Sequence, residues 1–333
     1  MTGLMVPHDD GAAGDIFQTY LTYDLLVAAA EIRRHGDVQA TMSFDMSEPR
    51  PIRFNGFEGI HLVGDVWGDE NAWPVLLMHG GGQTRHAWGN TAEVLARRGW
   101  RAVSLDLRGH GDSEWALNGD YSFTTYAADC IAVCDQLGRP PVLVGASLGG
   151  VTAILAEGAS DRVVSSGLVL VDITHRTNPA GVQRIRDFMA SGLGGFATLE
   201  EAAAAIAAYQ PHRKRRVNPS GLMKVLRQRR DGRWYWHWDP RFLDHGRTEV
   251  PRENFEAIFH AAMKNVRVPA LLVRGTLSDV VTEEGVREFL RQIPHAKVVD
   301  VGGAAHMVAG DQNDAFSGAV IAFLEHDVRP RLG

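Results

Sequence analysis

The 333-residue chain has few cysteines, no excess of positive charge and no long apolar run, and each shortage excludes a class of protein. Cys130 and Cys134 are too few for a disulfide framework or a cysteine metal centre, and so few cysteines fit a reducing compartment. The formal net charge of −6 argues against a general nucleic-acid binder, and the short basic run at 212–216 (HRKRR) does not alter this. No apolar run reaches membrane-spanning length, and the N-terminus has no signal-peptide pattern. We therefore expect a cytoplasmic protein that binds neither nucleic acid nor membranes.

Motifs for nucleotides and metals are missing as well. No GxxxxGK[ST] segment occurs, and the first strand-turn-helix stretch lacks GxGxxG, so nucleotide binding is not expected. The histidines that might be considered as ligands lie on different predicted loops without the HExxH spacing of a zinc site: His79, His86, His110 and His306. We therefore predict a protein without a metal or cofactor.

Short apolar runs alternate with amphipathic stretches along most of the chain. Residues 75–80 (VLLMHG) form a short apolar run, as in a strand that is covered on both faces, and residues 101–107 (RAVSLDL) and 167–173 (GLVLVDI) are further predicted strands. Stretches with helical spacing of apolar residues separate these runs. The alternation predicts an α/β fold, in which a doubly wound, mostly parallel sheet carries helices on both faces.

The alternation stops between residues 174 and 265 and resumes after Pro269. The interval holds helical stretches and an aromatic run at 232–240 (GRWYWHWDP), and it is too long for a simple loop. We therefore predict a core formed by residues 51–173 and 266–333, with a helical cap, 174–265, inserted into it.

Residues 1–50 form a predicted N-terminal extension with one helix. Helical spacing of apolar residues runs over 16–35, and Gly36 is a plausible stop. Three partners for this helix stay open: the core, the cap or a second subunit, the last of which would make a homodimer.

One serine is flanked by small residues that a plain buried strand would not require. Ser147 follows the apolar run PVLVGA and opens a helical stretch, within Gly-Ala-Ser-Leu-Gly-Gly at 145–150. This is the strand-turn-helix context of a nucleophile elbow, whose strained turn requires small neighbours. The helix that begins at Leu148 directs its positive end toward developing negative charge. A simple packing turn of small residues is the alternative, and we predict that Ser147 is a nucleophile.

A serine nucleophile needs a base, and the base needs an orienting acid. In enzymes with this elbow the chain order is serine, acid, histidine. His306 follows the last predicted strand, and Asp279 follows the strand before it, so these two are the predicted base and acid. Their structural alternatives are a loop histidine and a cap for the helix beginning near Glu283. Asp172, which ends an earlier strand, is the rival acid and ranks second.

Asp106 also ends a predicted strand, but it precedes the serine. We expect it to bond within the turn at 108–111 rather than to act in catalysis.

The same chemistry requires an oxyanion hole, whose donors point at the developing negative charge. One expected donor is the backbone N–H of Leu148, directly after the serine. The other is expected from the loop HGGGQTRHAW at 79–88, because glycines let the backbone approach a ligand closely. We predict Gly81 for this N–H, with Gly82 as the alternative.

The substrate-binding residues are predicted among tryptophans. Trp88 follows the glycine loop, and Trp234 and Trp236 lie in the aromatic run of the cap. Such side chains could line an apolar acyl pocket. Attachment of the cap to the core is an equally good interpretation of the aromatic run.

With these residues identified, the chain resembles the α/β-hydrolase superfamily. The resemblance covers about residues 51–333 and is closest to the capped group of serine esterases, epoxide hydrolases and cofactor-free haloperoxidases. It rests on five segments: HGGG at 79–82, DLRGHGDS at 106–113, GASLGG at 145–150, SD at 278–279 and GAAHMV at 303–308. It implies an eight-stranded sheet with the cap inserted after strand six.

The resemblance favours a serine hydrolase that cleaves a small carboxylic ester or lactone through an acyl-enzyme on Ser147. Similar enzymes that open epoxides or remove halides have aspartate at the elbow, which argues against those activities here. The alternatives are perhydrolysis with the same triad and hydrolysis of a carbon–carbon bond in a diketone acid. The latter would use Trp88 and Asn90, with Arg85 or a cap arginine binding an acid group. A hydrolase-like binding protein is the non-enzymatic alternative.

Overall fold

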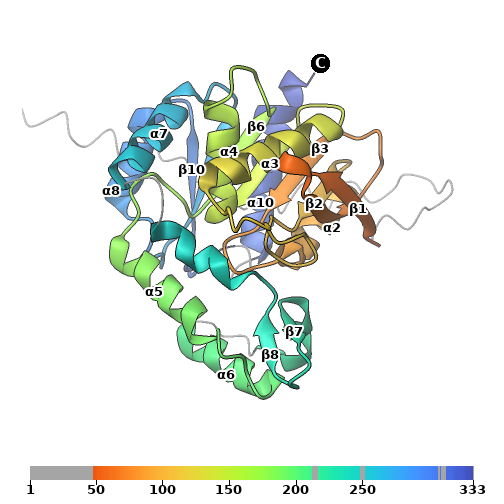
Figure 1. Ribbon diagram of the computed structural model, residues 1–333. Coiled ribbons are helices and arrows are strands. Elements are labelled where there is room, and N and C mark those ends of the chain that lie inside the picture. Colours follow the sequence, from red (N-terminus) through yellow and green to blue (C-terminus); the bar gives the residue numbers. More distant parts are fainter. Residues whose placement is uncertain (1–47, 212–216, 248–251, 307, 309–312, 333) are drawn as a thin grey trace, which may run out of the picture. The chain divides into compact units, whose positions relative to one another are not determined.

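The structure is a computed structural model that describes residues 48–332, apart from 212–216, 248–251, residue 307 and 309–312 (Figure 1). The predicted N-terminal helix at 16–35 and the basic run at 212–216 lie outside the described residues.

Eight strands form one sheet in the order β1-β2-β4-β3-β5-β6-β9-β10. The β1–β2 and β2–β4 pairs are antiparallel, and all the other pairs are parallel. The bounds are β1 Arg50–Asn55, β2 His61–Trp67, β3 Pro74–Met78, β4 Arg101–Leu105, β5 Val142–Ala146, β6 Gly167–Val171, β9 Ala270–Gly275 and β10 Lys297–Val301. The prediction of an eight-stranded, mostly parallel sheet is confirmed.

The sheet separates two apolar clusters, and β3 shows why its sequence is uniformly apolar. Leu76 and Met78 belong to one cluster, whereas Val75 and Leu77 belong to the other. Side chains alternate between the faces of a strand, so a strand that is covered on both sides needs apolar residues at every position. All five residues of β3 are accordingly buried.

Helices cover both faces of the sheet (Figure 1). The first cluster lies under α3, α4, α7 and α8, and the second lies under α2 and α10. The bounds are α2 Gly89–Arg97, α3 Phe123–Gln136, α4 Leu148–Gly158, α7 Arg252–Asn265, α8 Glu283–Gln292 and α10 Asn313–Phe323, with short helical turns η2 Phe57–Gly59, η3 Arg85–Trp88, η6 Leu324–Val328 and η7 Arg329–Arg331.

The elements between β6 and α7 form an inserted segment, which we call the cap, and those labelled in Figure 1 lie together below the sheet in that view. The cap elements are α5 Pro179–Ser191, α6 Leu199–Tyr209, η4 Pro219–Lys224, β7 Leu226–Gln228, β8 Trp234–Trp236 and η5 Pro240–Arg247. The aromatic run supplies β8, which pairs with β7 in a small antiparallel sheet. These elements enclose an apolar cluster of their own.

The last helix of the predicted cap, α7, belongs to the layer that covers the sheet. Its Met263 is fully buried in the core cluster. The Asn265 side-chain amide donates to Gly158 O at 3.0 Å, and a Cβ on Gly158 would lie only 2.0 Å from Ala262 O. The apolar face of α7 therefore packs against α4, and the chain rejoins the core layer at α7, before the predicted cap boundary at residue 265.

Backbone hydrogen bonds join the cap to the core along a seam, which we define as residues 109–111 and 237–239. Gly111 N donates to His237 O, and Asp239 N donates to Gly109 O, both at 2.8 Å. The Tyr121 hydroxyl adds a bond to the buried Asp239 carboxylate at 2.5 Å. Two of these three bonds join backbone groups, so they do not depend on which side chains the seam residues carry.

Two further sequence expectations concern the helices. Cys130 and Cys134 are buried free thiols on α3, as expected for a packed helix face. In the part of the chain that the structure describes, no helix has the length and apolar character needed to cross a membrane.

Candidate active site

Ser147 lies at the turn between β5 and α4, with a backbone conformation that few non-glycine residues adopt. Its φ is 47° and its ψ is −108°. Such strain persists only where the surroundings impose it, and it clusters at functional sites. Here the Ser147 N–H donates to Val171 O at 3.2 Å, which ties the turn to the end of β6. The serine is partly exposed.

The glycines around Ser147 are required by close backbone contacts. A Cβ on Gly145 would lie 2.2 Å from Gly149 O, and one on Gly149 would lie 2.3 Å from Met78 O. A Cβ on Gly150 would lie 2.4 Å from Ile173 Cγ2. These distances are far shorter than any van der Waals contact, so β5, α4 and β3 can approach only without side chains here.

His306 pairs with Asp172, the acid that sequence reasoning ranked second. Its Nδ1 lies 2.7 Å from Asp172 Oδ2. Asp172 directly follows β6, is fully buried and has a φ of 50°. The loop before His306 reaches this position because Gly275 has no side chain: a Cβ there would lie 2.4 Å from Ala305 O. Since the Ser147 N–H bonds to the residue before Asp172, Ser147 and the His306–Asp172 pair lie at the same edge of the sheet.

The structure does not bring Asp279, the predicted acid, to His306. The Asp279 carboxylate instead forms an ion pair with Arg184 on α5 of the cap. It does not cap the following helix either, because Thr282 accepts the Gly285 N–H at 3.1 Å there. Asp279 does follow the end of β9, as predicted. In the loop there, however, the residue that bonds to Asp172 is Ser278, which precedes Asp279.

In the glycine loop after β3, two of the three backbone N–H groups have acceptors. Gly80 N donates to Gln83 Oε1 at 2.9 Å, and Gly82 N donates to His110 Nε2 at 3.1 Å. For Gly81 N the described residues provide no such acceptor. This N–H and that of Leu148, the first residue of α4, are the predicted pair of oxyanion donors.

A buried histidine fixes the direction of the Gly81 N–H. His79 Nε2 accepts from Leu107 N at 3.0 Å, so the neutral ring carries its proton on Nδ1, 2.8 Å from Gly80 O. The C=O and N–H of a trans peptide point in opposite directions. The Gly81 N–H is therefore turned away from His79.

His79 and His110 are fully buried, and this holds both rings neutral. Burial lowers the pKa of His79 to about 4, against a weaker opposing effect of its bond to the Gly80 carbonyl. Burial, together with the neighbouring His79, lowers the pKa of His110 to about 3. His110 must be neutral at Nε2 to accept the Gly82 N–H, so the geometry of the loop depends on this state.

The three predicted substrate-binding tryptophans lie in apolar cores. Trp88 is 1% exposed and packs against Phe316 of α10, with ring centroids 5.8 Å apart. Trp236 is buried against Phe196 within the cap, and Trp234 packs against the same cap cluster. The prediction that Trp88 lines the pocket is not supported, because that side chain fills the space between α2 and α10. For the cap tryptophans, packing is the role that their contacts support.

Two residues that sequence reasoning missed cover the glycine loop. A Cβ on Gly81 would lie 3.0 Å from Cζ of Phe242, and a Cβ on Gly82 would lie 2.9 Å from Cε of Met189. Both side chains come from the cap. Phe242 also packs edge-on against His110, with ring centroids 5.0 Å apart. Phe242 is a single aromatic outside the WYWHW run, and no sequence motif indicated it.

Asp106 forms structural hydrogen bonds, but its partners lie outside the turn at 108–111 where they were expected. It accepts hydrogen bonds from Arg85 N at 2.6 Å and from Asp112 N at 2.9 Å. The Arg85 guanidinium also pairs with Asp65 and Asp112. Arg85 is thus neutralised by carboxylates of the chain and is not available to bind an acidic substrate group.

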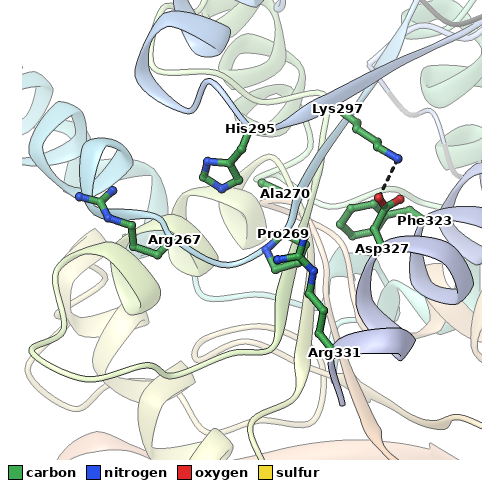
Figure 2. Close-up of a pocket in the computed structure, with 8 residues that line it drawn as sticks. All are labelled: Arg267, Pro269, Ala270, His295, Lys297, Phe323, Asp327 and Arg331. Carbon is green, nitrogen blue, oxygen red and sulfur yellow. Dashed lines mark ion pairs between the residues drawn. The ribbon is translucent and has the colours of Figure 1, made fainter. Parts of the chain in front are cut away.

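The cavity shown in Figure 2, of about 260 Å³, lies at the opposite end of the strands. Ala270 and Lys297, the first residues of β9 and β10, line it. Lys297 points to Asp327 there and pairs with it at 2.6 Å. Ser147 and Asp172, in contrast, follow the ends of β5 and β6. In parallel α/β sheets ligands bind at the carboxyl ends of the strands, so we place the candidate site at Ser147.

Comparison with known families agrees with this architecture. The model of the alpha/beta hydrolase family matches residues 75–319. The chain belongs to this family. Its relatives include the esterase Rv0045c of Mycobacterium tuberculosis, 31% identical over 258 residues that cover 74% of this chain and 80% of the relative. The 3-hydroxybutyrate-oligomer hydrolase of Cupriavidus necator is 27% identical over 261 residues, covering 74% and 88%.

Solved structures of other proteins show the same fold. The crystal structure of E-2-(acetamidomethylene)succinate hydrolase superposes with a TM-score of 0.73, covers 84% of this chain and 100% of its own, and is 20% identical. At this identity the likeness concerns the fold alone. A structure of the Mycobacterium tuberculosis esterase Rv0045c has a TM-score of 0.65 at 27% identity, covering 90% and 97%.

The buried histidines generate a prediction about acid stability. Unfolded histidines titrate near a pKa of about 6.5, so His79 and His110 take up protons on unfolding at any pH between about 4 and that value. The free energy of unfolding therefore falls as pH decreases through this window, by up to about 1.4 kcal/mol per pH unit for each ring.

We expect ¹⁵N-histidine NMR spectra to show at least two rings that stay neutral at pH 5. The urea-unfolded chain serves as the control, in which every ring titrates near pH 6.5. Protonation of all rings in the folded protein above pH 6 would contradict the burial argument.

Proposed function

We propose that this protein is a serine hydrolase that cleaves a carboxylic ester or lactone through an acyl-enzyme on Ser147. The observation that carries the proposal is the bond of 2.7 Å between His306 and the buried Asp172, beside a serine held in a strained elbow. The membership of a hydrolase family supports the reaction class, and two relatives that span most of the chain are ester hydrolases by name.

The proposed mechanism assigns one task to each group. Asp172 accepts the Nδ1–H of His306, which leaves Nε2 as the base that takes the Ser147 proton. In this structure Ser147 and His306 form no hydrogen bond with each other, and such catalytic bonds often tighten only when substrate binds. The Ser147 oxygen attacks the carbonyl carbon, and the imidazolium then protonates the departing alcohol. Water hydrolyses the acyl-enzyme by the same steps in reverse order.

The oxyanion that forms in each step is assigned to the N–H groups of Gly81 and Leu148. Leu148 begins α4, whose positive end adds to the stabilisation. The Gly81 N–H is pre-oriented by His79, so no reorganisation is needed when charge develops. Loss of one such donor typically costs about a hundredfold or more in rate.

The alternative of carbon–carbon bond hydrolysis has less support. It relies on Trp88 and Asn90, but the former is in the core and the latter is exposed on α2. Its proposed acid-binding residue Arg85 is occupied by three aspartates. Perhydrolysis needs the same groups as ester hydrolysis, so it stays open as a side activity.

Labelling with a fluorophosphonate tests the nucleophile without knowledge of the substrate. Ser147 would form the Oγ–P bond, fluoride would leave, and His306 would take the hydroxyl proton. We expect intact-mass spectra to show one adduct on the wild type and none on Ser147→Ala, and the wild type to hydrolyse p-nitrophenyl acetate. A folded wild type that is neither labelled nor active on p-nitrophenyl esters would refute the proposal.

Replacement of the two candidate acids tests the assignment of Asp172. We expect Asp172→Asn to reduce kcat by about a thousandfold or more, because the histidine loses the acceptor that sets its tautomer. Asp279→Asn is the matched control, and it should change kcat by less than about tenfold, since it breaks a partly exposed ion pair. The reverse ranking in p-nitrophenyl acetate hydrolysis would restore Asp279 as the acid.

The position of Phe242 predicts that it limits substrate size. Its ring contacts the residue whose N–H is assigned to the oxyanion, so Phe242→Ala should open space next to the reacting carbonyl. We expect the ratio of kcat/KM for p-nitrophenyl octanoate over acetate to rise about tenfold, a value in the range of one or two accommodated methylenes.

Phe188→Ala is the control for that ratio. Phe188 is half-buried like Phe242 but stacks on Tyr209 inside the cap, with ring centroids 4.2 Å apart. An equal change of the ratio in both variants would mean that the cap, and not the Phe242 ring, sets the preference.

A further inference from the structure

Ser278 lies behind the catalytic acid and makes a contact that the triad alone does not require. Its hydroxyl is 2.6 Å from Asp172 Oδ2, the same oxygen that accepts from His306. Ser278 lies on the loop after β9, in a different segment from either partner. Through Ser278, the loop after β9 is therefore bonded to Asp172, the residue that also pairs with His306.

The direction of this hydrogen bond is fixed by the neighbours of Ser278. A serine hydroxyl has one proton to donate and two lone pairs to accept with. The N–H groups of Val280 and Val281 both donate to Ser278 Oγ at 3.1 Å. With its lone pairs occupied, the hydroxyl has its proton free only for Asp172. The turn after β9 thus makes Ser278 a dedicated donor to the carboxylate.

The Asp172 carboxylate is fully buried and depends on such donors. Oδ1 accepts from Gly275 N at 3.3 Å, a long bond, while Oδ2 accepts from Ser278 and His306. A buried carboxylate is costly unless it is hydrogen-bonded, and hydrogen bonds to its charged form favour that form. Ser278 supplies the shortest of these bonds.

We propose that Ser278 is a positioning residue, which holds the Asp172 carboxylate in the orientation that His306 needs and moderates its negative charge. This inference rests on the proposed serine-hydrolase function. Without the Ser278 proton, the carboxylate rotates more freely and attracts the imidazolium more strongly. The first effect lowers kcat, and the second shifts the acid limb of the pH–rate profile to higher pH. KM stays unchanged, because Ser278 acts through Asp172 and does not touch the substrate.

The test uses full-length Ser278→Ala, with Ser278→Thr as the conservative variant that keeps the hydroxyl. We would measure the rate of phosphonylation by a fluorophosphonate from pH 5 to 9, and kcat and KM for p-nitrophenyl acetate. Ser278→Ala should lower kcat about tenfold, the scale of one hydrogen bond to a charged group. Its acid limb should move upward, and Ser278→Thr should match the wild type in both respects.

Ser165→Ala is the matched structural control. Ser165 is also a buried serine whose hydroxyl donates to a carboxylate, that of Glu157, at 2.9 Å, but this pair is away from the candidate site. It should lower the melting temperature and leave kcat and the pH profile unchanged. If Ser278→Ala does not fold, Ser278→Cys keeps a similar shape with a weak donor and should show the same two changes.

The outcomes separate this inference from the proposed function. If the wild type is labelled and Ser278→Ala retains its rate and acid limb, the positioning role is wrong while the serine-hydrolase proposal stands. A lower rate with an unmoved acid limb, not restored by Ser278→Thr, would likewise reduce Ser278 to a structural residue. A wild type that is not labelled would overturn both.

Discussion

The buried carboxylate of Asp172 organises the edge of the sheet around it. A negative charge removed from water needs donors from several directions, and here they come from Gly275, Ser278 and His306. Gly275 ends β9 and Ser278 lies on the loop directly after it, whereas His306 comes from the loop after β10. The charge thus holds the loops after β9 and β10 at the end of β6, and the Ser147 N–H is bonded to the same strand end through Val171 O.

The cap and the glycine loop form a second layer of constraint. Buried neutral histidines of the core form hydrogen bonds with the glycine loop, while Phe242 and Met189 of the cap lie against Gly81 and Gly82. The seam of backbone bonds at 109–111 and 237–239 fixes the cap next to the turn that contains His110. The oxyanion donor assigned to Gly81 is therefore shaped by core and cap together, although its own side chain is a single hydrogen.

The sequence predicted those parts of the site whose geometry demands particular residue types. A strained turn between a buried strand and a helix needs small neighbours, so Ser147 and its glycines were recognisable. The sequence could not distinguish between the two candidate acids, because Asp172 and Asp279 both follow strands. A position after a strand does not determine the direction in which a side chain points. Trp234 and Trp236 were ambiguous because burial within the cap and lining of a pocket require the same apolar surface. Phe242 was missed since its role depends only on tertiary contacts.

The three glycine contacts at the elbow separate what this fold restricts from what it leaves free. Gly145, Gly149 and Gly150 meet backbone or core atoms at distances that allow no side chain at all. Residue 147 itself carries a side chain, and its strained backbone is held by bonds from its N–H to Val171 O and from Val151 N to its carbonyl. The scaffold therefore constrains the frame around the reactive group much more tightly than the group it presents. Within this turn, positions 145, 149 and 150 have no room for any side chain, whereas position 147 presents one.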